Sequence, residues 1–445
     1  MGLLLLLALS VVFVVGATVK LKMHPFLALI IVAFGFGIFA GMPLEEVVSS
    51  VNGGFGGTIG YIGIVILAGS IIGTFLERSG GAYRLAESML GITGEKNVPL
   101  AMTAVGYVIS IPVFCDSGFV LLSPLNKALA RKAKLSLAAC AAGLSLGLYA
   151  THTMVPPTPG PLAAAGILEA DLGLVIIWGL VVSVVAAAAG WLFAVKIASK
   201  VTIEDDGPAD APVAPVSADA PSTAKSLLPI LLPVILIVAQ SIAGFPTQPF
   251  GDGRFAAFLD FVGQPVVALL IGVFLAFLLP NKLNREMLSS SGWVGQAVID
   301  AAGIIVITGA GGAFGRVLLN SGIADVIGDT LTDYPRIGIW LPFIIAAGIK
   351  TAQGSSTVSI ITTAGLVSPL LPALGLDGSV AKALVVVSIG AGAMVVSHAN
   401  DSYFWVVTQF SKMTLNQGYR VQSLGTLVEG CAAAATVWII SLFVL

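Results

Sequence analysis

Residues 111–119 read IPVFCDSGF and place one carboxylate, Asp116, inside a long apolar run. No basic residue follows Asp116 until Lys127. A charged side chain at the centre of a bilayer costs roughly 2.5–3.5 kcal/mol on insertion scales, so such residues are rare and usually functional. Pro112 lies in the same stretch and interrupts the hydrogen-bond ladder of a helix. The stretch therefore indicates a polar break within a membrane-embedded segment.

The composition places the rest of the chain in a membrane as well. The 445 residues are 57% hydrophobic and 10% charged, with a mean hydropathy of +1.01, which lies outside the range of soluble domains. Apolar runs such as 27–41 are continuous rather than alternating, which predicts helices instead of a barrel. Lysine and arginine are scattered and the net charge is −2, so a nucleic-acid partner is not expected. The three cysteines lie in apolar segments and are expected to be small core residues.

Most of the apolar runs have the length of one membrane crossing, about 20 residues. Full crossings are expected near 2–19, 24–41, 58–76, 135–152, 173–196, 227–244, 262–280, 292–318, 379–397 and 421–445. The first run lacks the basic region of a signal peptide, and we interpret it as a span.

Two further apolar regions, 98–127 and 338–372, are too long for a single crossing. The first is broken by Pro112 and Asp116, and the second by TAQGSST at 351–357. Breaks of this kind are tolerated at membrane depth only where the backbone is buried in protein or lines a cavity. Both regions are therefore predicted to be re-entrant helical hairpins.

The distribution of charge supports this topology. If both hairpins return to their own side, the N-terminus and the C-terminus lie outside and most of the 21 basic residues lie on the cytoplasmic face. Residues 201–225 are rich in proline, alanine and acidic residues, and they predict a flexible cytoplasmic linker. This linker would join a first membrane repeat, 1–200, to a second, 226–445.

The two halves resemble each other. Residues 69–90 match 311–331, and in each half a broken hairpin and then a helix ending at a histidine follow, at His152 and at His398. The first half starts outside and the second inside, so the repeats are inverted. The predicted fold is an all-α polytopic membrane protein with two inverted-topology repeats. In secondary transporters of this architecture, the substrate binds where the broken elements meet.

Four polar clusters stand in apolar surroundings and are the candidate substrate site. They are Ser110, Asp116 and Ser117; His152 in ATHTMVPPTPGP (150–161); Lys350, Gln353, Gly354, Ser355, Ser356 and Thr357; and His398, Asn400 and Asp401. Hydroxyls, amides and the free N–H groups of broken helices suit a small anion that carries hydroxyl groups. Asp116, His152 and Asp401 are the candidates for proton coupling.

Each cluster also has a structural interpretation. Asp116 would then shape the hairpin by accepting backbone hydrogen bonds, and Asp401 would cap the next helix. Lys350 would extend to the surface, and His152 and His398 would be satisfied structural groups. The hydroxyls of the third cluster would pack helices together. With only three histidines in the chain, a zinc site is not expected.

At these clusters the chain resembles the gluconate permease family of bacterial proton-coupled sugar-acid symporters, within the ion transporter superfamily. The resemblance rests on GYVISIPVFCDSGF (106–119), HTMVPPTPGP (152–161), AQGSSTVSIITTAG (352–365) and SHANDSYFW (397–405). It implies a homodimer in which a mobile part bearing both hairpins moves against a scaffold in an elevator-like manner. It also implies substrates such as gluconate, other aldonates, glycerate or D-serine. The chain departs from the family pattern at Thr158, where many relatives carry a histidine.

The functional hypothesis is symport of a small hydroxylated carboxylate with protons across the bacterial inner membrane, without a resident cofactor. Asp116 is then expected to be protonated when substrate is bound and deprotonated when the site empties inward. Sodium coupling is the alternative within transport, because broken helices also form sodium sites. An uncoupled anion channel or sensor is the alternative from another class. An enzyme is not expected, because no nucleophile and base pair or metal cluster is visible.

Overall fold

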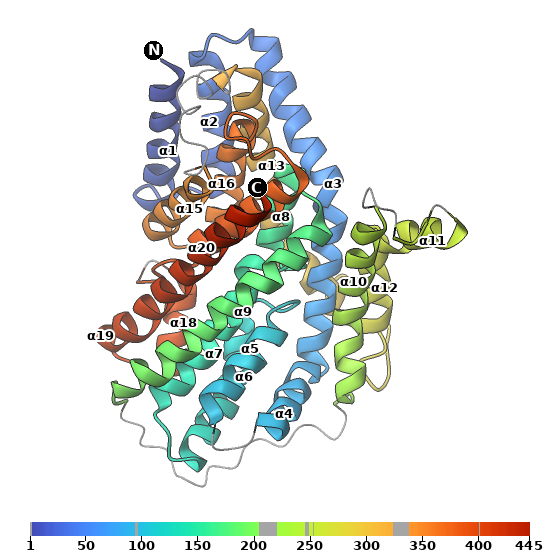
Figure 1. Ribbon diagram of the computed structural model, residues 1–445, viewed down its shortest axis with the longest axis vertical. Helices are drawn as coiled ribbons and strands as arrows, with labels where there is room; N and C mark the ends of the chain where they lie inside the picture. Colours follow the sequence, from blue (N-terminus) through green and yellow to red (C-terminus); the bar gives the residue numbers. More distant parts are fainter. Residues whose placement is uncertain are drawn as a thin grey trace.

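The computed structural model describes residues 2–93, 97–203, 220–244, 249–251, 253–323, 338–399 and 401–445. Over these ranges the chain is helical and contains no strand, which confirms the all-α class (Figure 1). Among the described residues, four helices are long and apolar enough to cross a membrane, or six if two bent pairs each form one span. Large apolar side chains are exposed on many helices, as expected of a lipid-facing surface.

The helices form two series with the same order of elements. The first contains α1 (Leu3–Val19), α2 (Pro25–Phe39), α3 (Leu44–Arg78), α4 (Gly81–Thr93), α5 (Val98–Ile109), α6 (Cys115–Lys132), α7 (Leu137–Met154), α8 (Pro159–Leu168), α9 (Leu172–Lys196) and η2 (Ala198–Lys200). The second contains α10 (Thr223–Ala243), α11 (Arg254–Gly263), α12 (Pro265–Ala276), α13 (Trp293–Asn320), α15 (Trp340–Gln353), α16 (Ser356–Val367), η4 (Ser368–Leu370), α17 (Ser379–Met394), α18 (Ser402–Phe410), α19 (Leu415–Gly418), the π-turn η5 (Tyr419–Ser423) and α20 (Leu424–Val444). In each half a long helix, α3 or α13, precedes two shorter helices, α5 and α6 or α15 and α16. A buried helix, α7 or α17, a short helix, α8 or α18, and another long helix, α9 or α20, come after them. In the first half α4 also lies between α3 and α5.

Three elements differ from the lengths expected from hydropathy. The crossing expected at 58–76 is part of the longer α3, which begins at Leu44. The crossing expected at 262–280 corresponds to the shorter α12, which Pro265 begins and which is bent by 69° from the preceding α11. Of the expected linker, residues 204–219 lie outside the described residues. Its last residues already belong to α10, which Ser222 caps by accepting a hydrogen bond from Lys225 N.

Both regions expected to contain a break consist of two helices. Between α5 and α6, residues 110–114 leave the helix around Pro112. Between α15 and α16 the chain turns at Gly354, whose φ of +96° is accessible to glycine and strained for other residues. Each break therefore occurs at the helix-breaking residue and next to the polar residues of its cluster.

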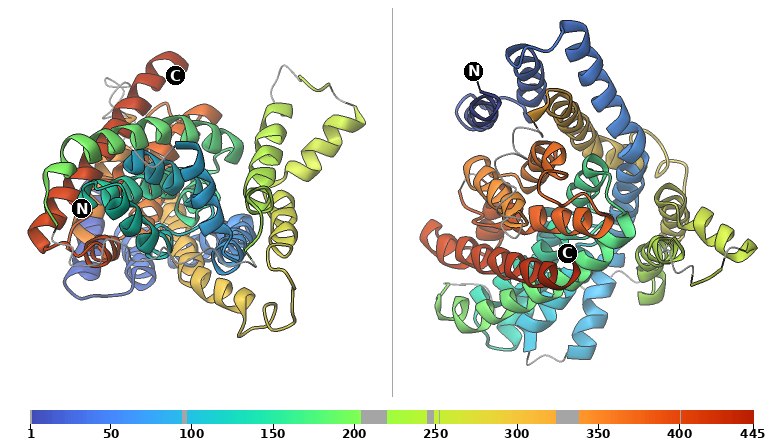
Figure 2. Two further views of the ribbon diagram at one scale, coloured as in Figure 1. Left: turned by 90° about the horizontal axis from the view of Figure 1, so that it is seen from below. Right: turned by 45° about the horizontal axis from the view of Figure 1, so that its top comes forward.

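The long helices α3 and α13 cross at close range. A Cβ atom on Gly54 would lie 2.5 Å from the Gly312 carbonyl oxygen and 2.8 Å from the Ala313 Cα. The last long helices of the two series, α9 and α20, lie side by side (Figure 1). Helices α10, α11 and α12 form an arm at one side of the bundle (Figure 2). In this arm α12 packs against α3, and α10 packs against α9 and α4.

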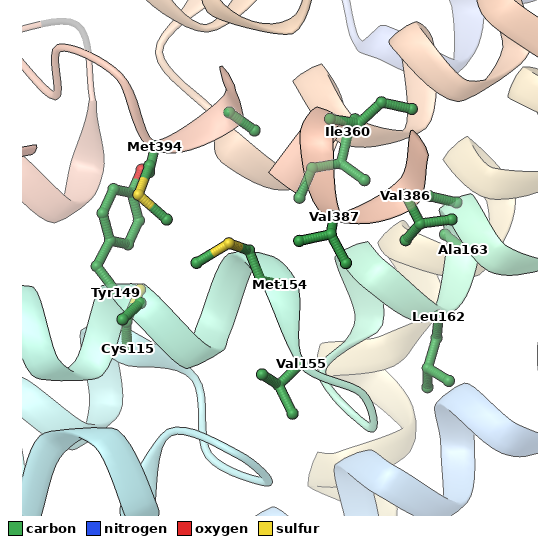
Figure 3. Close-up of a cluster of buried hydrophobic side chains, with 14 of the residues drawn as sticks. Cys115, Tyr149, Met154, Val155, Leu162, Ala163, Ile360, Val386, Val387 and Met394 are labelled. Atoms are coloured by element: carbon green, nitrogen blue, oxygen red, sulfur yellow. The ribbon is translucent and has the colours of Figure 1, made fainter. Parts of the chain in front are cut away.

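The interior between the two series is apolar and tightly packed. Met154, at the end of α7, lies near Val387 of α17, and Tyr149 lies near Met394 (Figure 3). A Cβ atom on Gly390 would lie 2.3 Å from the Thr153 carbonyl oxygen, so the two helices approach backbone to backbone. This packing fixes the ends of α7 and α17, where the polar clusters begin.

Candidate functional site

Three helix N-termini meet at one cavity of about 310 Å³. They are the first turns of α6, α16 and α18, which contribute Cys115 and Asp116, Ser356 and Thr357, and Ser402 and Tyr403. His152, near the end of α7, also lines the cavity. The volume lies at the lower end of the range for small-molecule sites, so the cavity suits a compact ligand.

The orientation of these helices makes the cavity favourable for an anion. The first N–H groups of a helix have no partner within the helix, and the aligned peptide dipoles place partial positive charge there. Two of the three ends have side-chain caps: Ser355 accepts a hydrogen bond from Val358 N at 3.3 Å, and Asp401 accepts one from Tyr403 N at 3.0 Å. The start of α6 has no side-chain cap. Its free N–H groups can therefore bind a carboxylate.

A buried ion pair lies behind this cavity. Lys350 Nζ is 2.5 Å from Asp401 Oδ2, and the two side chains are 0% and 5% exposed. Lys350 also donates to the carbonyl of Gly354 at the helix break and lies 5.7 Å from the centroid of the Tyr149 ring. Ser397 Oγ donates a hydrogen bond to the same Asp401 oxygen. Lys350 therefore does not extend to the surface, and Asp401 both caps α18 and holds the lysine.

Asp116 presents a carboxylate oxygen without a partner. It lies in the first turn of α6, half-buried at the cavity wall. Its Oδ1 atom accepts no hydrogen bond from any described residue. A buried oxygen in this condition is uncommon in folded proteins, because burial without a hydrogen bond is unfavourable. This oxygen is available to a proton or to a hydroxyl group of a ligand.

The two matched histidines have different environments. His152 is 6% exposed, lines the cavity and has no partner for Nδ1 within the described structure. Its ring is stacked against Tyr149, with centroids 6.4 Å apart and planes inclined by 10°. His398 lies away from the cavity wall, and its Nε2 is 2.8 Å from the Thr351 carbonyl oxygen. The similarity of position in the sequence therefore does not produce two equivalent groups.

Of the remaining predicted residues, some line the cavity and others form hydrogen bonds within the two helix breaks. Ser355, together with its neighbours in α16, lines the cavity. Gln353 accepts a hydrogen bond from Ser355 N at 3.3 Å, and Ser110 donates to the Val113 carbonyl at 3.1 Å within the first break. Ser117 follows Asp116 in α6 and does not line the cavity. Asn400 lies outside the described residues.

One wall of the cavity was missed by the sequence analysis. It consists of Asp300, Gly303, Ile304 and Ile307 of α13, a helix interpreted only as a membrane span. Asp300 was a visible signal, because it is a carboxylate within an apolar run. Its Oδ1 accepts a hydrogen bond from Gln296 at 2.7 Å.

The cysteines also differ from the expectation. Cys140 is a buried core residue, whereas Cys115 is a buried residue of the cavity wall. Cys431 is exposed, so the expectation of three core cysteines was wrong at that position. All three are free thiols. A helix that faces lipid presents apolar and weakly polar side chains outward, which hydropathy does not distinguish from a core face.

A larger cavity, of about 420 Å³, lies between α3, α8 and α13. Glycines make up much of its wall, together with Arg316 and Glu169. It contains none of the predicted site residues. We therefore place the functional site in the smaller cavity, where the helix N-termini and the unpartnered polar atoms converge.

Comparison with protein families gives one match over almost the whole chain. Residues 2–443 match the model described as GntP family permease. The chain is 34% identical over 419 residues to a gluconate permease of Pseudomonas aeruginosa, which covers 92% of each chain. It is 32% identical over 452 residues to the D-serine transporter DsdX of Escherichia coli, with 98% of each covered. It is also 32% identical to the inner membrane permease YgbN of Escherichia coli, with 96% of each covered.

Solved structures with the same fold are transporters. The YdaH transporter of Alcanivorax borkumensis superposes with a TM-score of 0.66 at 15% identity, over 95% of this chain and 99% of that one. MtrF of Neisseria gonorrhoeae superposes with a TM-score of 0.65 at 14% identity, over 96% of each chain. At this identity the likeness describes the fold alone. The family and the closer relatives are permeases and transporters rather than enzymes.

Proposed function

We propose, since the chain belongs to the GntP family of permeases, that it is a secondary active transporter which imports a small hydroxylated carboxylate by proton symport. Gluconate or a related sugar acid is the proposed substrate. The observation that supports this most directly is the meeting of three helix N-termini at a cavity of about 310 Å³. Such a site attracts a carboxylate and leaves hydroxyl groups of the protein available for a polyol chain.

The proposed binding mode uses the two helix breaks together. The substrate carboxylate lies at the first turns of α6 and α16, where N–H groups point into the cavity. Ser356, Thr357 and Ser402 provide hydroxyls at the same wall and bind the hydroxyl groups of the substrate. Lys350 contributes little net positive charge to the back of the cavity, because its ammonium group is paired with the carboxylate of Asp401. Asp401 therefore acts as a positioning group in this state.

Asp116 is the proposed proton carrier. An anionic substrate in the same cavity disfavours a second negative charge, so Asp116 is protonated when the substrate is bound. After the substrate leaves on the cytoplasmic side, that repulsion ends and the proton is released. His152 remains a second candidate because its Nδ1 has no partner among the described residues. Asp401, also predicted to couple protons, has both oxygens engaged by Lys350, Ser397 and Tyr403.

The proposed architecture is a homodimer of a multi-pass inner-membrane protein, with both termini outside. The repeated order of elements supports two inverted repeats, in which α5 with α6 and α15 with α16 are the re-entrant hairpins. A transport part bearing both hairpins would move against a scaffold that includes α3, α13 and the α10–α12 arm. This arrangement carries the cavity from one side of the membrane to the other.

Two alternatives are kept because specific observations favour them. Sodium coupling is favoured by the free carboxylate oxygen of Asp116 next to a helix break, since carboxylates and carbonyls form sodium sites. D-serine or glycerate is favoured by the relationship to a D-serine transporter. From another class, an uncoupled anion channel or sensor would use the same cavity.

Uptake into proteoliposomes tests these possibilities. Purified protein is reconstituted, and labelled gluconate uptake is measured with an imposed pH gradient, with a sodium gradient at equal pH, and with neither. Proton symport predicts accumulation above the external concentration only with the pH gradient. Accumulation with a sodium gradient alone would show that sodium, rather than the proton, is the coupling ion. Equilibration of gluconate without accumulation would identify a channel. Uptake of labelled D-serine or glycerate, in the absence of uptake of labelled gluconate, would reassign the substrate.

A further inference from the structure

Glu429 is a carboxyl group buried in the second turn of α20, and no described residue neutralises it. Its side chain is 0% exposed, and neither Oε1 nor Oε2 has a hydrogen-bond partner among the described residues. A Cβ atom on Gly190 of α9 would lie 3.5 Å from Oε1 and 2.9 Å from the Leu146 Cβ. The carboxyl group is therefore packed against the backbone of α9 and beside a leucine of α7.

The helices around α20 provide no counter-charge at this position. Titratable side chains on these neighbours are Cys140, Tyr149 and His152 of α7, Lys196 of α9, Lys350 of α15, Lys382 of α17, and Tyr419 and Arg420 of η5, with Tyr403 of α18 nearby. In the described part of the chain, none forms an ion pair or hydrogen bond with Glu429. Lys350 is already paired with Asp401. An unpaired buried carboxylate is strongly unfavourable, so this position favours the protonated form of Glu429.

A series of hydrogen-bonded polar groups extends from the cavity wall toward Glu429 and ends one helical turn before it. Thr426, three residues before Glu429 on the same face of α20, accepts a hydrogen bond from Ser397 N at 3.0 Å. Ser423 Oγ donates to the Ser397 carbonyl at 2.5 Å. Ser397 Oγ in turn donates to Asp401 at the cavity wall. Fully buried hydroxyls thus extend from the cavity to within one helical turn of Glu429.

We propose that Glu429 is a second proton-binding site of the transport cycle, separate from Asp116, so that two protons accompany each monovalent carboxylate. The inference rests on the proposed proton symport. The anionic substrate disfavours a further negative charge in the same low-dielectric bundle, so the loaded form has Glu429 protonated. A proton from outside forms an O–H bond with the Glu429 carboxylate, and after substrate release that bond breaks and the proton leaves to the cytoplasm. With Asp116 carrying the first proton, each cycle moves one net positive charge inward.

Membrane potential separates this inference from simple proton symport. Proteoliposomes are prepared with equal pH on both sides, and a potassium gradient with valinomycin sets an inside-negative potential. Wild-type protein is expected to accumulate labelled gluconate under the potential alone. In Glu429→Gln the potential-driven uptake is expected to be at least tenfold lower than in the wild type, whereas uptake driven by a pH gradient is retained. Glu429→Asp keeps the ionisable group and is expected to restore the response to potential. Glu46→Gln, the same change at an exposed position, is the matched control and is expected to behave as wild type.

The possible outcomes distinguish the two proposals. Wild-type uptake that depends on the pH gradient but not on potential would overturn the role of Glu429 and leave proton symport standing. Wild-type uptake that depends on neither would overturn both. A Glu429→Gln protein with the wild-type response to potential would assign Glu429 to packing alone. If Glu429→Gln does not purify as a folded protein, the wild-type ratio of charge to gluconate decides: one charge per substrate supports the inference, and zero overturns it.

Discussion

Lys350 Nζ lies 2.5 Å from Asp401 Oδ2 and joins the last turn of α15 to the first turn of α18, although the two residues are 51 positions apart. Lys350 precedes the break at Gly354, and Asp401 precedes a helix that lines the cavity. The pair therefore fixes one break of the site relative to the other polar cluster. Several consequences of this and of the neighbouring geometry can be measured.

Removing one partner of the buried pair should destabilise the protein strongly. Asp401→Asn leaves the Lys350 charge buried without compensation, so we expect the free energy of unfolding to fall by about 3–5 kcal/mol. Combining it with Lys350→Met should recover a large part of that loss. Thermal unfolding in detergent measures both variants. The partly exposed pair Arg84 and Glu87 is the control, and Glu87→Gln, on its exposed partner, should lower the free energy of unfolding by less than about 1 kcal/mol. Similar losses at the two pairs would contradict the role given to Lys350.

Replacing the free carboxyl of the cavity should uncouple transport. Asp116→Asn keeps the size of the side chain and removes the group proposed to exchange a proton. Accumulation of gluconate driven by a pH gradient should be lost, whereas exchange of internal for external gluconate should remain. Asp377→Asn, at an exposed position, should change neither activity. Retention of pH-driven accumulation in Asp116→Asn would remove Asp116 from the mechanism.

The thiol of the cavity wall should report occupancy. Cys115 lines the cavity and is 2% exposed, so only a small reagent such as methyl methanethiosulfonate is expected to reach it. In a Cys140→Ala background, gluconate should slow modification of Cys115 several-fold. Cys431 is exposed and remote from the cavity wall, and its modification should not respond to gluconate. Mass spectrometry of the two peptides measures both rates in one sample. Equal protection of both thiols, or of neither, would place the substrate elsewhere.

A hydroxyl of the cavity wall should contribute to affinity. Thr357→Val preserves shape and removes the hydrogen bond proposed between Thr357 and the substrate, which corresponds to about 0.5–1.5 kcal/mol, or roughly a 2–12-fold increase in KM. Thr362→Val makes the same change in the same helix at a buried position away from the cavity, and it should leave KM unchanged. Concentration-dependent uptake measures the difference. An equal effect of the two changes would indicate a general packing effect in α16.

The close crossing of α3 and α13 should not tolerate a methyl group. Gly54→Ala would bring its Cβ to 2.5 Å from the Gly312 carbonyl oxygen, and we expect a loss of about 1–3 kcal/mol in stability. Gly53→Ala adds the same atom one position earlier, where nothing lies within 4 Å. That control should be neutral or slightly stabilising, because alanine favours helix more than glycine does. Thermal unfolding of the two variants provides the comparison.

Local physical chemistry accounts for much of the fold and part of the site. Continuous apolar runs require helices in a membrane, and Pro112 and Gly354 stand where the helices break because one interrupts the ladder and the other adopts a positive φ. Several of the polar residues near these breaks lie at the helix N-termini that line the cavity. The gluconate permease family was also recognisable from the four motifs, and the comparisons confirm it.

Contacts between elements that are distant in the chain could not be predicted from the sequence. Nothing in the local pattern indicates that Lys350 meets Asp401 or that α13 supplies a cavity wall, because both depend on how the helices pack in space. Cys431 was misread for a related reason: in a membrane protein, an apolar environment does not distinguish the core from the lipid face. The difference between His152 and His398 likewise arises from their surroundings rather than from their matched positions.

The wall contributed by α13 differs from the rest of the cavity in what it offers a ligand. Gly303, Ile304 and Ile307 provide no hydrogen-bonding side chain, and the carboxylate of Asp300 is engaged by Gln296. The helix N-termini proposed to bind the substrate carboxylate all belong to the other walls. In the proposed transport cycle, the walls that hold the substrate can therefore move along α13 without breaking a hydrogen bond to these three residues, so only weak van der Waals contacts have to be exchanged.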